Sequence, residues 1–193
     1  MTVPGPIAID EAAIGRRIAE IAAAIGEAHP LGVVLLPILP EAGRFACDLA
    51  IAIGTSVDVD PIRISAYRPQ GPPAVLTREI DLPLEGRDAI IVAGVLDTGL
   101  RVRFALTALA AQAGSSLTGS SLTGSSLTVC ALLDRPDRRL VPLPIEHVAF
   151  QVPDCLFAGY GLGRARGHDH LPAIHFADHA TAERARRQHL AIA

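Results

Sequence analysis

The chain has 193 residues, a formal net charge of −3 at pH 7, and a composition in which 50% of residues are hydrophobic and 19% are charged. This length suits a single domain over residues 1–193 with a sizeable core, and the composition excludes an intrinsically disordered chain. A weakly negative charge without a basic stripe argues against nucleic acid as the main partner.

The first part of the chain alternates a helical pattern with apolar runs. Residues 10–27 place isoleucines at spacings of four and three, which predicts a helix with Asp10 as its N-cap. The continuous apolar run over 31–39 has the length of a strand and is typical of parallel strands that are buried on both faces. We expect a second helix over 43–54 and a strand over 57–67.

The middle of the chain contains a second buried strand and an internal repeat. Residues 68–75 are rich in proline and glycine and predict a loop or flap. A strand is expected over 88–96 and a helix over 100–113. The unit GSSLT then occurs three times over 114–128, which we interpret as a surface loop insertion because lengthening a loop costs little; an interaction loop is the alternative. A strand over 129–134 follows.

The last part of the chain completes the pattern. Residues 147–153 predict a strand and residues 181–193 a helix. Strands therefore alternate with helices of about 10 to 15 residues, which is typical of βαβ units. The fold class expected from this order is α/β, with a parallel sheet flanked by helices.

Cysteine usage and apolar runs indicate the compartment. The three cysteines, Cys47, Cys130 and Cys155, form no CxxC pair, which favours a reducing environment. The N-terminal residues lack the basic segment and apolar core of a signal peptide, and no apolar run reaches the ~18 residues that span a bilayer. We expect a soluble, cytoplasmic protein that does not associate with membranes.

The turn after the strand over 88–96 is a candidate anion site. Backbone amides at the start of a helix lack intrahelical partners and carry partial positive charge, which suits a phosphate or a carboxylate. Thr98 offers a hydroxyl, Gly99 lets the backbone approach a ligand, and Leu100 and Arg101 begin the helix. The alternative is structural: the preceding aspartate caps the helix, and the arginine is a surface residue.

Three ordered blocks of sequence carry a resemblance to a known family. They are EGRDAIIVAGVLDTGL, CALLDRPDRR and HVAFQVPDCLFAGYGLGRARGHDHLPAI. Over roughly residues 10–175 the chain resembles the bacterial hypoxanthine-guanine phosphoribosyltransferases. The resemblance implies a type I phosphoribosyltransferase fold, a small hood built from the chain termini, and a homodimer. It also implies that residues 97–101 wrap the 5-phosphate of phosphoribosyl pyrophosphate, with Asp97 near the purine N7 as general acid or base.

The resemblance also implies a ligand pocket. Tyr67 is the retained tyrosine of the flap, and Arg135 stands where the family has a lysine that reads the purine 6-oxo group. Leu156 stands where an aromatic side chain stacks on the base, with Phe157 one position later.

Several positions depart from the family pattern. Ala93 and Gly94 stand where the family has an acidic pair that holds the ribose hydroxyls. The segment 39–41 reads Leu-Pro-Glu where a lysine-containing loop usually contacts pyrophosphate. Gly163 stands where an acidic residue helps to hold magnesium, and Asp169 where an arginine contacts pyrophosphate.

These departures lead to three functional hypotheses. The leading one is a repurposed enzyme of specialised metabolism with a diverged active site, which acts without magnesium or pyrophosphate on a small, anionic molecule held by residues 97–101. In it, Asp97 is the acid–base residue and Arg101 and Arg135 contact the ligand. The second is a non-catalytic ligand-binding or regulatory protein, and the third is a 6-oxopurine phosphoribosyltransferase of purine salvage. No cofactor is expected, and magnesium enters only if ordinary phosphoribosyl transfer is retained.

Two further candidate sites are less favoured. Histidines gather near the C-terminal end and could ligate a metal, but no third ligand stands at a convincing spacing, so no metal site is predicted. These are His168, His170, His175, His179 and His189. Cys155 lies beside the expected base pocket, but the neighbouring Asp154 would raise the pKa of its thiol and weaken it as a nucleophile.

Overall fold

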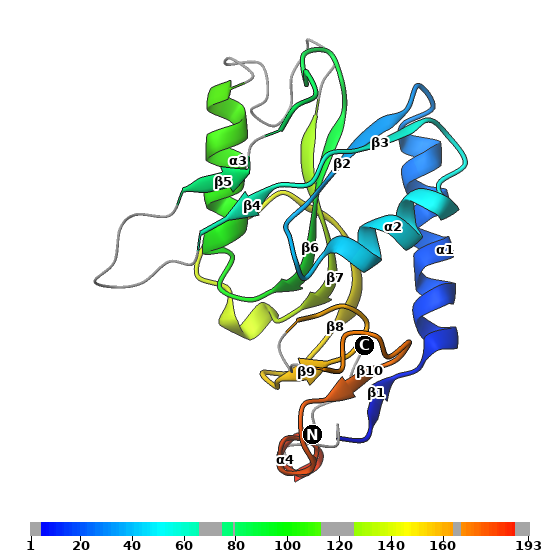
Figure 1. The fold of residues 1–193 in the computed structure, drawn as a ribbon, viewed down its shortest axis with the longest axis vertical. Coiled ribbons are helices and arrows are strands. Elements are labelled where there is room, and N and C mark those ends of the chain that lie inside the picture. The colour runs from blue at the N-terminus through cyan, green and yellow to red at the C-terminus, as the bar shows by residue number, and fades with distance from the viewer. Residues whose placement is uncertain (1–4, 66–74, 79, 113–125, 164–166, 188–193) are drawn as a thin grey trace.

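The main body of the protein is a five-stranded parallel sheet in the order β3-β2-β6-β7-β8 (Figure 1). The structure is a computed structural model, and it describes residues 5–65, 75–78, 80–112, 126–163 and 167–187. The strands of this sheet are β2 (Val33–Pro37), β3 (Val57–Val59), β6 (Ala89–Leu96), β7 (Leu127–Asp134) and β8 (Ile145–Gln151). The expected α/β class with a parallel sheet is confirmed.

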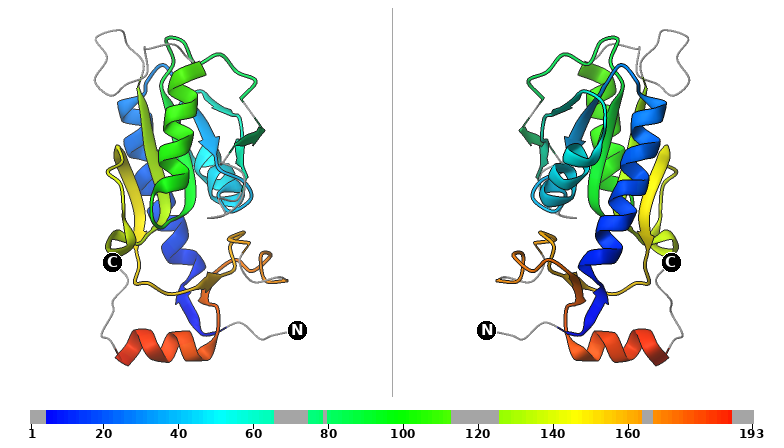
Figure 2. Two further views of the ribbon diagram at one scale, coloured as in Figure 1. Left: turned by 90° about the vertical axis from the view of Figure 1, so that its left-hand side faces the viewer. Right: turned by 90° about the vertical axis from the view of Figure 1, so that its right-hand side faces the viewer.

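Helices cover both faces of this sheet (Figure 2). The helices α1 (Glu11–Ala28) and α2 (Gly43–Ala52) share one core cluster with alternate strand residues such as Leu35 and Ile90. The helix α3 (Leu100–Gln112) shares the other cluster with the intervening residues, such as Leu36 and Ile91. Successive side chains of a strand point to opposite faces, and here both faces are covered. This double burial is why the strands appear in the sequence as continuous apolar runs.

The first helix follows the predicted pattern. The side chain of Asp10 accepts a hydrogen bond of 2.7 Å from the backbone amide of Ala13, so the predicted N-cap is confirmed. The four isoleucines of the helical repeat are all buried, and they are Ile14, Ile18, Ile21 and Ile25. The apolar face therefore packs inward as the spacing predicts.

A small antiparallel sheet joins segments from near the two ends of the chain (Figure 1). Its order is β1 (Ile7–Ile9), β10 (Ile174–Phe176) and β9 (Phe157–Ala158). This sheet agrees with the expected hood built from the chain termini. The hydroxyl of Tyr160 donates a hydrogen bond of 2.5 Å to the carboxylate of Asp48 on α2, which ties the hood to the main body.

The strand expected over 57–67 is divided in the structure, so that prediction is wrong in its extent. It forms β3 and then β4 (Arg63–Ile64), which pairs with β5 (Leu76–Arg78) in a separate two-stranded sheet. The expected flap over 68–75 lies outside the described residues apart from Val75.

The break between β3 and β4 occurs at Asp60. Its carboxylate accepts hydrogen bonds from the backbone amides of Asp81, at 2.6 Å, and of Leu82, at 2.9 Å. An ion pair of 2.8 Å with Arg78 adds to these contacts. Pro61 follows and has no amide to donate, which interrupts the regular pairing, although Ile62 still donates a hydrogen bond of 2.9 Å to the carbonyl of Pro37.

The end of the GSSLT repeat is also part of a strand. Leu127 and Thr128 begin β7 and pair with Ala89 and Ile90, so this strand starts before the expected residue 129. β6 extends far enough to pair with both of these residues. Residues 114–125 of the repeat lie outside the described residues, and Ser126 is the residue that directly precedes β7.

The last helix, α4 (His179–Arg187), begins before the expected residue 181. The carboxylate of Asp178 accepts a hydrogen bond of 2.6 Å from the amide of Thr181, which satisfies a free amide of the first turn. Residues 188–193 of the expected helix lie outside the described part of the chain. None of the helices in the described part is long and apolar enough to cross a bilayer.

Asp60→Asn is predicted to destabilise the protein at neutral pH. Burial alone would raise the pKa of Asp60, but the hydrogen bonds from Arg78 and from the amides of Leu82 and Asp81 outweigh burial and lower it. The ionised carboxylate therefore stabilises the fold above its unfolded-state pKa of about 3.9, and this contribution is lost as the pH falls below that value. We expect a loss of about 1.5–3 kcal/mol in the free energy of unfolding at pH 7.

Urea denaturation between pH 7 and pH 3 measures this effect. The matched control is Asp58→Asn, which removes an exposed ion pair with Arg87 and is expected to cost less than about 1 kcal/mol. Equal losses for the two variants would show that Asp60 does not hold the chain break in place.

Candidate functional site

The candidate site lies where the strand order of the main sheet reverses. The chain passes from β2 outward to β3 and then returns to β6 on the other side of β2. In open α/β sheets, ligands bind beyond the carboxyl ends of the strands at such a switch point. The loop 38–42 after β2 and the turn 97–99 after β6 flank this position.

The turn after β6 has the geometry of a ligand-facing loop. Gly99 has a φ of +83°, and a Cβ atom there would lie 3.0–3.1 Å from the side chains of Arg139, Leu143 and Val141, so both the backbone and the packing favour glycine. The carbonyl of Gly99 accepts a bond of 2.8 Å from the amide of Arg103, which is a first-turn bond of α3. The backbone amides that precede Arg103 in the first turn of α3 have no partner within the helix.

A cavity of about 120 Å³ opens at this turn. Its lining residues are Val95, Leu96, Asp97, Thr98, Gly99, Arg101 and Val102. The structure thus brings four of the five predicted anion-site residues to one cavity. The fifth, Leu100, is outside the lining, and its side chain is 47% exposed.

The carboxylate of Asp97 belongs to a charged network. Its Oδ1 accepts a hydrogen bond of 2.5 Å from Nε of Arg138, and Nη1 of Arg138 lies 2.9 Å from the carboxylate of Asp154. Arg135 lies 3.8 Å from Asp97 and 3.7 Å from Asp154. The hydrogen bonds from Arg138 to Asp154 and Asp97 raise the pKa of its guanidinium. Two guanidinium groups therefore orient Asp97 at the end of β6.

The residues expected on the base side separate into buried and exposed positions. Arg135 is 3% exposed, its guanidinium donates to the carbonyl of Cys155, and it lies 5.9 Å from the centroid of the Phe157 ring. Phe157 itself is 1% exposed and packs in the core, whereas Leu156 is 50% exposed. Of the two, only Leu156 has a surface that a ligand can reach directly. Tyr67 lies outside the described residues.

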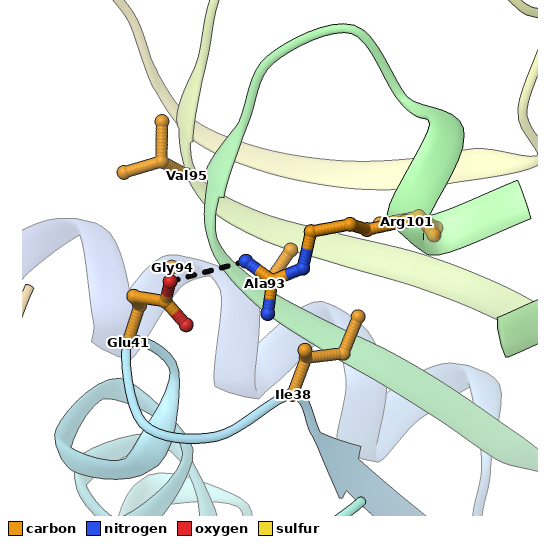
Figure 3. A pocket seen from close by; sticks show the side chains of 7 residues that line it. Ile38, Glu41, Ala93, Gly94, Val95 and Arg101 are labelled. Atoms are coloured by element: carbon orange, nitrogen blue, oxygen red, sulfur yellow. Dashed lines mark hydrogen bonds and ion pairs between the residues drawn. The ribbon is translucent and has the colours of Figure 1, made fainter. Parts of the chain in front are cut away.

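The small residues on β6 make room for the loop after β2 (Figure 3). A Cβ atom on Gly94 would lie 2.3 Å from the backbone oxygen of Glu41, so the loop backbone occupies the space of a side chain at position 94. The guanidinium of Arg101 reaches across Ala93 and Gly94 and bonds the carboxylate of Glu41 at 3.0 Å (Figure 3). A cavity of about 30 Å³ lies between the two loops. Glu41 therefore occupies the neighbourhood where the resemblance places an acidic pair.

Sequence reasoning missed two parts of this site. The first is Arg138, which follows Arg135 by three positions in the loop after β7. The carboxyl ends of neighbouring parallel strands meet at one edge, so a contact with Asp97 could have been anticipated. The second is the pair of Glu41 with Arg101, which cannot be found without knowing that β2 and β6 are neighbours.

The other candidate residues have structural contacts. Cys155 is 7% exposed, and its carbonyl accepts from Arg135. Nδ1 of His175 lies 3.0 Å from the carbonyl of Gly5, and Asp169 accepts from the amide of Gly163 at 2.7 Å. Among the described residues, no group of three or more histidine, cysteine, aspartate or glutamate side chains is placed to hold a metal ion. His189 lies outside the described part.

Comparison with known proteins identifies relatives along most of the chain. It is 31% identical over 177 residues to the hypoxanthine phosphoribosyltransferase of Escherichia coli K12, covering 87% of this chain and 92% of that protein. It is 26% identical over 172 residues to the hypoxanthine-guanine phosphoribosyltransferase of Bacillus subtilis, covering 87% of this chain and 90% of the relative. No family model matches the chain.

Solved structures share the fold. A hypoxanthine-guanine phosphoribosyltransferase from Bacillus anthracis superposes with a TM-score of 0.79 at 29% sequence identity. The match covers 90% of this chain and 96% of that one. Type I phosphoribosyltransferases therefore have the same arrangement of sheet and helices as the structure described above.

Gly94→Ala is predicted to destabilise the protein, because the added methyl group would collide with the backbone of Glu41. Inserting a methyl group at a closely packed position costs about 1–3 kcal/mol. The matched control is Gly15→Ala on α1, where a Cβ atom meets nothing within 4 Å. That change is expected to stabilise the helix by about 0.5–1 kcal/mol. Thermal and urea denaturation of the two variants measure the difference, and a stable Gly94→Ala protein would contradict the close contact.

Proposed function

The chain belongs to the hypoxanthine phosphoribosyltransferase family, and from this membership we propose that it transfers a phosphoribosyl group to hypoxanthine in purine salvage. In this reaction a bond forms between N9 of the purine and C1′ of phosphoribosyl pyrophosphate, while the bond from C1′ to pyrophosphate breaks. The products are inosine monophosphate and pyrophosphate. The observation that carries the proposal is the 31% identity to the Escherichia coli enzyme over 92% of its length.

This proposal corrects the leading functional hypothesis from the sequence. That hypothesis was a repurposed enzyme that acts on a different molecule without magnesium or pyrophosphate. The relatives contradict it, because they are named hypoxanthine or hypoxanthine-guanine phosphoribosyltransferases. The same finding sets aside the non-catalytic binder. The hypothesis rested on the small residues Ala93 and Gly94, and the structure gives Gly94 a packing role against the backbone of Glu41.

The arrangement of the site supports specific roles for the residues at the end of β6. The turn at Thr98 and Gly99, with Arg101, would hold the 5-phosphate, since free amides and a guanidinium favour an anion. Asp97 would take the proton from N7 of hypoxanthine as N9 bonds to C1′. Arg138 holds the carboxylate of Asp97 in position for this transfer.

The base would be recognised from the other side of Asp97. Arg135 lies 3.8 Å from Asp97 and has a guanidinium that can donate to a 6-oxo group, but it is 3% exposed, so its contact with the base stays a prediction. Leu156 offers an exposed apolar side chain on which a purine could lie. A contact of Phe157 or Tyr67 with the ligand stays a prediction.

Magnesium, which the family resemblance implies, finds no complete set of ligands among the described residues. The carboxylates nearest the two cavities, Glu41 and Asp97, are already paired with arginines. Mg²⁺ is commonly held by one or two carboxylates together with substrate phosphates, so substrate oxygens would have to supply most of its ligands here. The roles proposed above rest on this chain's own side chains. A cytoplasmic location and a homodimer belong to the same proposal.

The proposed reaction is tested by incubating the purified protein with hypoxanthine, phosphoribosyl pyrophosphate and magnesium, and separating the products by chromatography. We expect formation of inosine monophosphate together with an equal amount of pyrophosphate. Guanine and xanthine, tested in parallel, define the range of bases accepted. The proposal would be falsified if none of these bases gave a nucleotide while the Escherichia coli enzyme did so under the same conditions.

Asp97→Asn is predicted to lower kcat by about 10²–10⁴-fold, because an amide cannot accept the proton from N7. The KM for phosphoribosyl pyrophosphate should change little, since the turn that holds the phosphate is kept. Asp137→Asn is the matched control, because Asp137 is an exposed aspartate in the loop after β7. Unchanged turnover in Asp97→Asn would remove Asp97 from the catalytic role.

A further inference from the structure

Among the described residues that line the cavity at the 97–99 turn, one side chain is cationic. Of the described residues that line it, Arg101 is the cation and Asp97 the anion. Asp97 is paired with Arg138, so its charge is already matched. Of the groups that line this cavity, Arg101 and the backbone amides are the ones that attract a phosphate.

Arg101 is already engaged by Glu41. Its Nη1 lies 3.0 Å from Oε1 of Glu41, and the side chains are 41% and 20% exposed respectively. Arg101 lines both the cavity at the turn and the smaller one between the loops, whereas Glu41 lines only the smaller one. The side chain of Arg101 extends across Ala93 towards Glu41, so its guanidinium lies beside that carboxylate (Figure 3).

The two partners extend from different elements, Glu41 from the loop after β2 and Arg101 from α3. The backbone oxygen of Glu41 lies against Gly94, at the position where a Cβ atom would be 2.3 Å away. The backbone of Glu41 therefore packs closely on β6, and its carboxylate reaches Arg101 from that position. Arg101 is a long side chain from the first turn of α3, and rotation about its side-chain bonds can turn the guanidinium from one cavity towards the other.

We infer that Glu41 is a specificity-determining residue that competes with the ligand's phosphate for Arg101. The inference rests on the proposed function, because it takes the 97–99 turn as the 5-phosphate site. A strongly charged phosphate draws the guanidinium away from Glu41, whereas a neutral or weakly charged ligand leaves the ion pair intact. Glu41 thereby sets how much negative charge a ligand must carry to occupy the turn.

Phosphate binding to the full-length protein tests this inference without any need for turnover. Inorganic phosphate is titrated by isothermal calorimetry into the wild type and into Glu41→Gln, which keeps the shape of the side chain and removes its charge. We expect Glu41→Gln to bind phosphate about two- to tenfold more tightly. The matched control is Glu27→Gln on α1, an exposed change that should leave the affinity unaltered.

A double-mutant cycle separates exchange of partners from repulsion through space. Arg101→Gln should weaken phosphate binding, and adding Glu41→Gln to it should then have almost no further effect, because the contested guanidinium is gone. If Glu41→Gln tightened binding equally in both backgrounds, Glu41 would act by its field alone and the inference would be overturned. Weaker binding in the Glu41→Gln single variant would overturn it as well, because the pair would then be orienting Arg101 for the ligand.

Further measurements check that the effect comes from the carboxylate of Glu41 and not from misfolding. Glu41→Ala removes the carboxylate with different packing and should shift the affinity in the same direction, and thermal melting checks that each variant is folded. The affinity ratio of inosine monophosphate to inosine should rise in Glu41→Gln, since only the nucleotide carries the phosphate. If no variant binds phosphate, Glu41 has no competitor and the inference falls, whereas formation of inosine monophosphate by the wild type judges the proposed function separately.

Discussion

The parallel pairing of β2 with β6 is the constraint on which the site depends. Four residues of each strand are in register, from Val34 opposite Ala89 to Pro37 opposite Val92, and both strands are buried on both faces. The strand order reverses here, so the loops that follow the two strands lie on either side of one crevice. Gly94 then lets the backbone of one loop lie directly on β6.

Charge at this end of the sheet is organised as pairs rather than as free groups. Arg138 joins Asp97 to Asp154, and Arg101 pairs with Glu41. Pairing offsets the desolvation cost of keeping several ionised side chains at a partly buried site, because each charge faces an opposite one. A ligand that enters must therefore replace existing contacts, and the net charge it brings decides how well it does so.

The sequence predicts those parts of the molecule whose signals are local. The helix capped by Asp10, the apolar strands and the turn at 97–99 all depend on residues close together in the chain. The short strand β1 and its partner β10 were not predicted, because strands of three residues show no periodicity and pair with distant segments. The contact of Glu41 with Arg101 was missed for the same reason, since it exists only through the pairing of β2 with β6.

The small sheet links segments that lie far apart in the chain. Gly5 contacts His175, 170 residues further along the chain, and Ile7 pairs with the same histidine. Because domains form as the chain emerges from the ribosome, the strands β2 to β8 are all available for assembly before the partner of β1 exists. During synthesis β1 therefore has no partner in this sheet until β10 has been made, whereas the strands of the main sheet can already pair with one another.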